Sequence, residues 1–248
     1  MILILFLKFY KNKKGTSMFR ILIILTLMSS LNSQDIKIIN EFSSVVNKEV
    51  NVNIDVNKSE LNWLGGLKYN VKDHYGKVGI KNGRFKIDEN NSISGKLIVD
   101  MSSITNEDVD SQWKQNLINH LKSEDFFDVK KFNTATIEIT SSKIIEKLDN
   151  NNMKVQVDAL LTIKSIKNKV RFYAEVDFGS SIKSAKGKMI FDRNDFEIQY
   201  RSEMHLYDSE SFWNKIGSSV SPAMDKIIKD NIEIDFNIVT RPIPLLIN

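Results

Sequence analysis

Residues 153–178, MKVQVDALLTIKSIKNKVRFYAEVDF, contain two runs of alternating apolar residues separated by a short polar stretch. In the first run Val155 and Val157 stand between polar residues, and in the second run Ala174 and Val176 do the same. Successive side chains of a strand point to opposite faces, so each run predicts a strand with one apolar and one polar face. The segment therefore predicts an antiparallel hairpin with one wet face.

The same alternation recurs along most of the chain. It is regular at 50–56 and 232–238 and less regular near 60–70, 75–88, 92–101, 134–148 and 184–191. Turn-forming residues separate these runs, for example Gly65-Gly66 and Lys164–Asn168. Eight or nine long strands in one domain predict two packed sheets or a closed barrel, and closure also removes exposed sheet edges.

Two segments depart from the strand pattern. Within 110–122, Trp113, Leu117 and Leu121 are spaced four apart, with Asp110 or Ser111 placed to cap the helix. Within 221–230, Ser221 and Pro222 suit a helix start, and Met224, Ile227 and Ile228 share a face. Both segments predict short helices.

The first 33 residues differ from the rest of the chain. A cationic segment precedes an apolar run, 21–28, and a short polar stretch, which is the order of a secretory signal peptide. The apolar run is far shorter than the roughly 20 residues needed to span a bilayer. We expect residues 1–33 to be a signal peptide with Met18 as the true start, 34–49 a lead-in, and 50–248 one barrel domain. An uncleaved anchor beginning at Met1 is the alternative.

The leader also accounts for the basic balance of the sequence. It holds five basic residues and no acidic one, so 30 of the 35 Lys and Arg residues remain against 31 Asp and Glu. A nucleic-acid role, which needs a basic face, is therefore not expected. The chain has no cysteine, which excludes disulfides and thiol chemistry. We expect a periplasmic protein, with full secretion as the alternative.

Catalytic and metal-binding motifs are not evident in the sequence. The three histidines, His74, His120 and His205, lie 46 and 85 residues apart, without a paired metal-binding spacing. No Gly-x-Ser-x-Gly elbow occurs. We therefore expect no enzyme activity, no metal and no cofactor.

Four segments, read in order, carry a family resemblance. They are Trp63–Gly66 with His74–Val78, then His120–Val129 with its double phenylalanine, then Leu161–Val170, and finally Phe191–Phe196. Together they resemble the YceI-like family of periplasmic lipid- or polyisoprenoid-binding proteins. The chain departs from the family pattern at Ser165 and Glu197, where glycine is usual, and the stretch 206–230 looks longer than usual.

The resemblance implies an all-β, lipocalin-like, eight-stranded antiparallel barrel with one or two short helices. Its apolar interior would hold a long isoprenoid, quinone or fatty lipid. Our own hypothesis is that the helix near Trp113 to Leu121 and the double phenylalanine act as lid elements. The resemblance also allows a homodimer, and a transient membrane contact is expected. Candidate tunnel residues, chosen for apolar bulk and strand parity, are Trp63, Phe85, Leu97, Val99, Phe126, Phe127, Val157, Phe172, Val176 and Phe236; His74 and His120 are candidates for the head group at the mouth.

Two other functions are kept as alternatives. The first is an interaction module of a membrane redox or stress system with a filled core, which predicts large side chains meeting across the barrel axis and no tunnel. The second is an enzyme acting on a lipid or quinone, with His74 or His120 as general base, which needs an orienting partner for the histidine.

Overall fold

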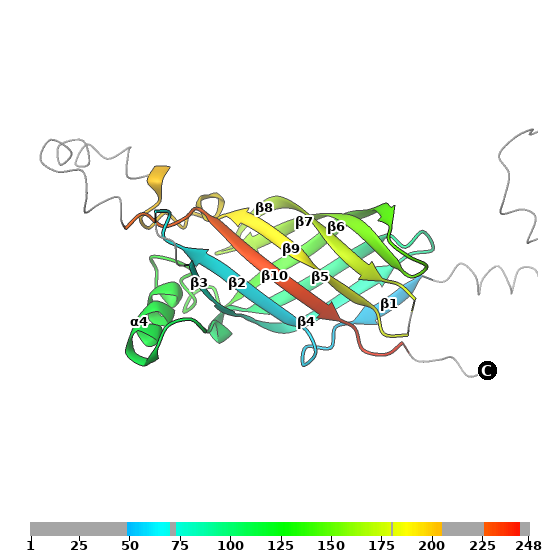
Figure 1. Cartoon of the computed structure of the whole chain (residues 1–248), viewed down its shortest axis with the longest axis horizontal. Helices are drawn as coiled ribbons and strands as arrows, with labels where there is room; N and C mark the ends of the chain where they lie inside the picture. Colours follow the sequence, from blue (N-terminus) through cyan, green and yellow to red (C-terminus); the bar gives the residue numbers. More distant parts are fainter. Residues whose placement is uncertain (1–48, 70–72, 180, 205–225, 244–248) are drawn as a thin grey trace, which may run out of the picture. The chain divides into compact units, whose positions relative to one another are not determined.

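The computed structural model describes residues 49–69, 73–179, 181–204 and 226–243. The predicted signal peptide and all of the lead-in except Glu49 lie outside these residues. The described part is all-β with a single α-helix, and its strands wrap around a common interior (Figure 1).

Ten strands form one sheet in which every neighbouring pair is antiparallel. Their order is β1-β4-β5-β6-β7-β8-β9-β10-β2-β3. The strands are β1 (Val50–Asn53), β2 (Glu60–Gly66), β3 (Asp73–Lys77), β4 (Gly79–Ile87), β5 (Ile93–Asp100), β6 (Thr134–Lys147), β7 (Asn152–Ile163), β8 (Ile166–Asp177), β9 (Ser184–Asp192) and β10 (Asn231–Val239).

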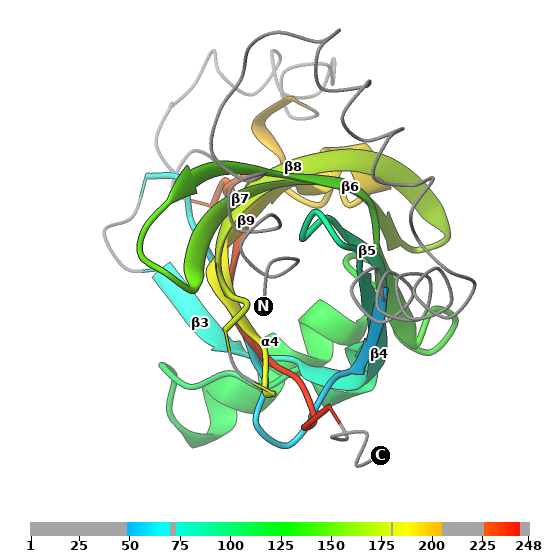
Figure 2. The same ribbon diagram turned by 90° about the vertical axis from the view of Figure 1, so that its right-hand side faces the viewer.

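The two ends of this sheet are connected by segments that follow each other directly in the chain. Only Val78 separates β3 from β4, and the Val78 N–H donates to the carbonyl oxygen of Leu61 in β2 at 3.1 Å. β1 pairs with β4 while β2 pairs with β10 and β3. The strands therefore surround a central space when viewed end-on (Figure 2).

The predicted number of eight strands is not what the structure has. The run predicted at 75–88 is broken at Val78, between β3 and β4, and β1 and β2 are separated by the turn that follows Ile54. The runs 50–56 and 60–70 were already predicted as separate, but alternation continues across Val78, so the pattern alone does not reveal that the strand changes its partner there.

The β7–β8 hairpin is tighter than the predicted turn at 164–168. Ile163 pairs with Ile166, so only Lys164 and Ser165 form the turn, with φ of 51° and 66°. Two left-handed residues in a two-residue loop match the twist of the flanking strands. The prediction of a turn at Gly65-Gly66 is wrong, because both residues lie within β2 and pair with β3.

We expect Ser165→Gly to raise the free energy of unfolding by roughly 0.5–1 kcal/mol, because only glycine adopts positive φ without steric cost. Chemical denaturation of the two proteins measures the difference. Ser94→Gly in β5 is the matched control and should destabilise, since Ser94 has no positive φ. A Ser165→Gly protein less stable than the wild type would contradict the expectation.

The core lies inside the ring of strands. Along β7 the alternate residues from Val155 to Ile163 are buried, as the alternation predicted. β8 continues the same face with Phe172, Ala174 and Val176, all less than 9% exposed. The inward side of the sheet is thus apolar and the outward side polar.

The predicted helix at 110–122 is present as α4 (Ser111–Lys122). Asp110 is the N-cap residue, but its side chain makes no capping hydrogen bond. Leu117 and Leu121 face the interior, whereas Trp113 is 75% exposed, so the three do not share one buried face.

The second predicted helix, 221–230, lies partly outside the described residues, and its described part, 226–230, is not helical. Ile227 is buried and Ile228 forms an isolated bridge with Leu67 instead. In the described ranges no helix is long and apolar enough to cross a membrane.

Candidate functional site

Two adjoining cavities occupy the interior of the sheet. The first has a volume of about 250 Å³ and lies at the end covered by α4, which contributes Leu117, His120 and Leu121 to its wall. The second has a volume of about 110 Å³ and extends toward Lys183 and Thr240. Nearly all described wall residues are apolar. Of these residues, His74 and His120 are the ionisable groups at the first cavity and Lys183 is the one at the second.

Each candidate residue taken from the sequence lies in the wall of one of these cavities. The first cavity is lined by Trp63, Val99, Phe126, Phe127, His74 and His120, and the second by Phe85, Leu97, Val157, Phe172, Val176 and Phe236. For the residues on strands the reason is parity, because every second residue points inward along a strand of a closed sheet. His120, on α4, and Phe126 and Phe127, in the turn that follows, reach the first cavity from the end of the sheet. That these residues contact a ligand stays a prediction.

The loop at 105–108 packs directly on β3, and Gly76 makes this contact possible. A Cβ at position 76 would lie 2.0 Å from the carbonyl oxygen of Thr105, which no side chain could tolerate. The same carbonyl accepts a hydrogen bond from Nε1 of Trp63 at 2.9 Å. Gly76 therefore positions both the loop and the tryptophan at the cavity.

The docked loop delivers Asp108 to His74. Nδ1 of His74 lies 2.8 Å from Oδ2 of Asp108, whose side chain is only 3% exposed. Asp108 also accepts from the Tyr75 N–H and from the buried Asn106 amide. A carboxylate at Nδ1 holds the proton there, so the neutral ring keeps Nε2 as a hydrogen-bond acceptor.

These contacts also change the titration of Asp108. Burial raises the pKa of Asp108, but the hydrogen bonds from Tyr75, His74 and Asn106 outweigh it and hold the pKa below the usual 3.8. A carboxyl group whose pKa is lower in the folded state stabilises the fold above its unfolded pKa. That contribution is lost as the pH falls through the folded pKa.

We therefore expect Asp108→Asn to be less stable than the wild type near neutral pH, and the difference to shrink below about pH 4. Thermal melts between about pH 7 and pH 3 measure it. Asp125→Asn serves as control, since that carboxylate is 56% exposed and lies 3.6 Å from His120. A stability difference for Asp108→Asn that stays constant over this range would contradict the assignment.

The second histidine, His120, lies near the C-terminal end of α4 and belongs to an aromatic cluster. The His120 ring meets Phe126 edge-on with ring centroids 5.0 Å apart and Tyr200 at 4.6 Å. Phe126 is buried, and Phe127 is half-buried beside it at 6.2 Å. This cluster connects the end of α4 to the segment that follows β9.

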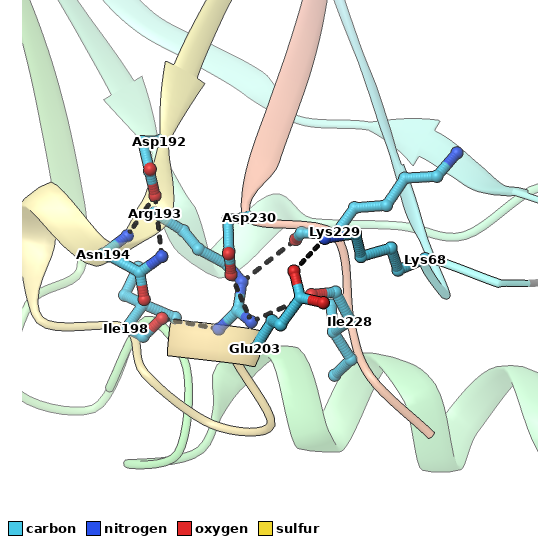
Figure 3. A network of polar contacts seen from close by, with 9 residues as sticks. All are labelled: Lys68, Asp192, Arg193, Asn194, Ile198, Glu203, Ile228, Lys229 and Asp230. Atoms are coloured by element: carbon cyan, nitrogen blue, oxygen red, sulfur yellow. Dashed lines mark hydrogen bonds and ion pairs between the residues drawn. The ribbon is translucent and has the colours of Figure 1, made fainter. Parts of the chain in front are cut away.

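A buried arginine holds the same end of the sheet together (Figure 3). Arg193, in the 3-10 turn η2 (Arg193–Phe196), is 1% exposed and donates to the carbonyl oxygens of Ile198, Ile228 and Lys229. Its Nη2 also lies 3.1 Å from Oδ1 of Asp230. Burial lowers the pKa of the guanidinium, and the Asp230 carboxylate opposes this.

This arginine network fixes one side of the cavity rim. Ile228 is a wall residue of the first cavity, and its neighbour Lys229 donates its N–H to Gly66 in β2 and its ammonium to Asp73. On the same rim Lys68 pairs with Glu203 (Figure 3). The rim cations therefore have carboxylate partners.

Metal-binding geometry is not found in the part of the chain that the structure describes. No group of three or more His, Asp or Glu side chains there could hold a metal ion. His205 lies outside the described residues.

Sequence reasoning missed Asp108 and Arg193 as members of this site. Asp108 lies 34 residues from His74, and no local pattern connects the two. For Arg193 the signal was present, since it lies in the family segment Phe191–Phe196, but an arginine in a turn is ordinarily exposed.

An antiparallel sheet closed around an apolar interior defines a class of small β-barrels that enclose a cavity. Within that class, a model of the YceI-like domain matches residues 52–240. The chain therefore belongs to the YceI-like family. A search of curated proteins gave no match.

The solved structures to which this chain is similar have little sequence identity to it. A polyisoprenoid binding domain from Saccharophagus degradans, implicated in plant cell wall breakdown, is 15% identical with a TM-score of 0.50, covering 79% of this chain and 100% of that one. Burkholderia cenocepacia BcnA is 16% identical with a TM-score of 0.46, covering 76% and 99%. The Campylobacter jejuni YCEI protein is 20% identical with a TM-score of 0.35, covering 58% and 70%.

Proposed function

We propose that this protein binds one long-chain lipid, an isoprenoid, a quinone or a fatty chain, inside the barrel without chemical change, and carries or sequesters it in the periplasm. One observation carries the proposal: two adjoining cavities with almost entirely apolar walls lie inside the sheet. The family and a neighbour described as a polyisoprenoid binding domain support it.

Apolar walls are sufficient for tight binding of such a ligand. Each methylene removed from water contributes about 0.8 kcal/mol, so a dozen carbons outweigh the cost of association. The filled-core alternative, an interaction module, predicts no such space. Phe172 and Phe236 do meet edge-on inside the barrel, with centroids 5.5 Å apart, but they line the second cavity and leave it open.

In this proposal the polar residues of the first cavity contact and orient the head group of the lipid. His74 with its fixed Nε2 acceptor suits a hydroxyl or, when protonated, a carbonyl oxygen. Among the described residues, the lining of the first cavity contains His74 and His120 but no lysine or arginine. The His74–Asp108 pair also resembles an oriented general base, which is the observation that favours an enzyme acting on a lipid or quinone.

The lid, the membrane contact and the export of the chain belong to the same proposal. Trp113 on α4 and Tyr75 on β3 are 75% and 48% exposed near the first cavity, and such side chains suit a membrane interface. The periplasmic location rests on the leader at 1–33. A homodimer is a further proposal, which sedimentation velocity tests.

The test is to purify the exported full chain under native conditions and compare its native and denatured masses. A stoichiometric lipid, or uptake of added isoprenol or fatty alcohol, is expected. Ala135→Phe, which places a ring in the first cavity, should abolish uptake, while Ile145→Phe on the exposed side of the same strand should not. If the wild-type chain carries no lipid and takes up no probe, the lipid-binding proposal fails and the interaction module becomes the favoured function. Recovery of a chemically altered probe would instead show that the protein is an enzyme acting on the lipid.

A further inference from the structure

The two cavities meet at one constriction. Four residues line both cavities, namely Leu61, Ile137, Met189 and Ile234. Met189 and Ile234 pair directly between β9 and β10, and Leu61 comes from β2 on the other side of β10. Ile137 comes from β6, across the interior (Figure 2).

Met189 differs from the other three constriction residues in how its side chain can move. Leucine and isoleucine are branched, whereas methionine is unbranched and adapts its shape to irregular space. Met189 is 3% exposed, so it has no freedom toward solvent and can only move along the interior. The opening between the cavities therefore depends on this residue more than on its neighbours.

At the far end of the second cavity the segments that follow β1 and β10 pair with each other and with Lys183. Lys183 donates its N–H to Oγ1 of Thr240 at 2.8 Å, and Thr240 bridges to Ile54. Asp55 donates its N–H to Val239 at 2.8 Å, and Arg241 donates to Asn53 at 2.8 Å. The first cavity, by contrast, is covered by side chains of α4 and the double phenylalanine. A chain that enters there reaches the second cavity only past the constriction.

We infer that Met189 sets the chain-length limit of the ligand. A short chain fills only the first cavity, while a longer chain displaces the Met189 side chain and extends into the second, which adds less than half of the first cavity's volume. This inference rests on the proposed function and concerns the specificity of the same site. It predicts a length dependence that a single open tunnel would not show.

The experiment titrates the full chain with straight-chain primary alcohols that differ only in length. For the wild type, affinity should rise roughly fourfold per added methylene until the second cavity is full. In Met189→Phe the rise should stop at a shorter chain, so that the longest alcohol binds at least about tenfold more weakly than to the wild type. Short alcohols should lose much less, although Met189 also lines the first cavity. Met189→Ala should keep the wild-type limit or extend it.

Two alanine positions provide matched variants if Met189→Phe fails to fold. Ala174 lines only the second cavity and Ala135 only the first, and both are buried. Ala174→Phe should weaken only long alcohols, whereas Ala135→Phe should weaken all lengths. Circular dichroism confirms that each variant is folded.

Several results would overturn the inference. Equal loss for short and long alcohols in Met189→Phe, or an unchanged length limit, would show that Met189 is only a packing residue. Selective loss of short alcohols in Ala174→Phe would show that the chain enters from the opposite end. A wild type that binds no alcohol of any length would refute the proposed function itself, which is a separate outcome.

Discussion

Replacing Arg193 with methionine should lower the free energy of unfolding by about 3–5 kcal/mol, which is the cost of removing one partner from a buried charged network. The guanidinium is 1% exposed and donates to three backbone carbonyls and to Asp230. Methionine fills a similar volume but donates no hydrogen bond. The carbonyls of 198, 228 and 229 would then be buried without these donors.

Denaturant unfolding followed by tryptophan fluorescence measures this loss. Arg171→Met is the matched control, because Arg171 also pairs with a carboxylate, Asp158 at 2.6 Å, but is 63% exposed. Exposed ion pairs contribute little to stability, so this control should unfold close to the wild type. Equal stability of the Arg193→Met and Arg171→Met proteins would show that the buried network is dispensable.

Replacing Phe127 with aspartate should weaken lipid binding by one to two orders of magnitude in a protein that remains folded. The Phe127 ring lines the first cavity beside Phe126 and is half-buried. Burying a phenylalanine side chain contributes about 1.5–3 kcal/mol, and the new carboxylate would also have to be desolvated against the lipid. Binding of a fluorescent fatty alcohol, displaced by an unlabelled one, measures the affinity.

The control for this prediction is Trp113→Asp on α4. It introduces the same charge in the same lid region, but Trp113 is 75% exposed and is not a wall residue of either cavity. Its affinity for soluble monomeric probe should be unchanged. If Phe127→Asp binds the probe with unchanged affinity, the hypothesis that the double phenylalanine is a lid element is wrong.

The positions of the strands and of the interior residues followed from local alternation. Apolar residues at every second position share one face of a strand, and one face of a closed sheet must point inward. The helix at α4 followed in the same way from the spacing of Leu117 and Leu121, although Trp113 was assigned to the wrong side. These are properties of short segments, so the sequence alone determined them.

The tertiary structure decided what depends on residues that are far apart in the chain. The strand break at Val78 comes from a change of partner strand, from β2 to β1 and β5, and Asp108 reaches His74 only because a loop packs on Gly76. The burial of Arg193 requires residues 228–230, more than 30 positions further along the chain, and the constriction at Met189 requires β6 and β2 together with β9 and β10. Alternation is set by neighbouring residues, whereas the division of the interior is set by which distant strands lie opposite each other.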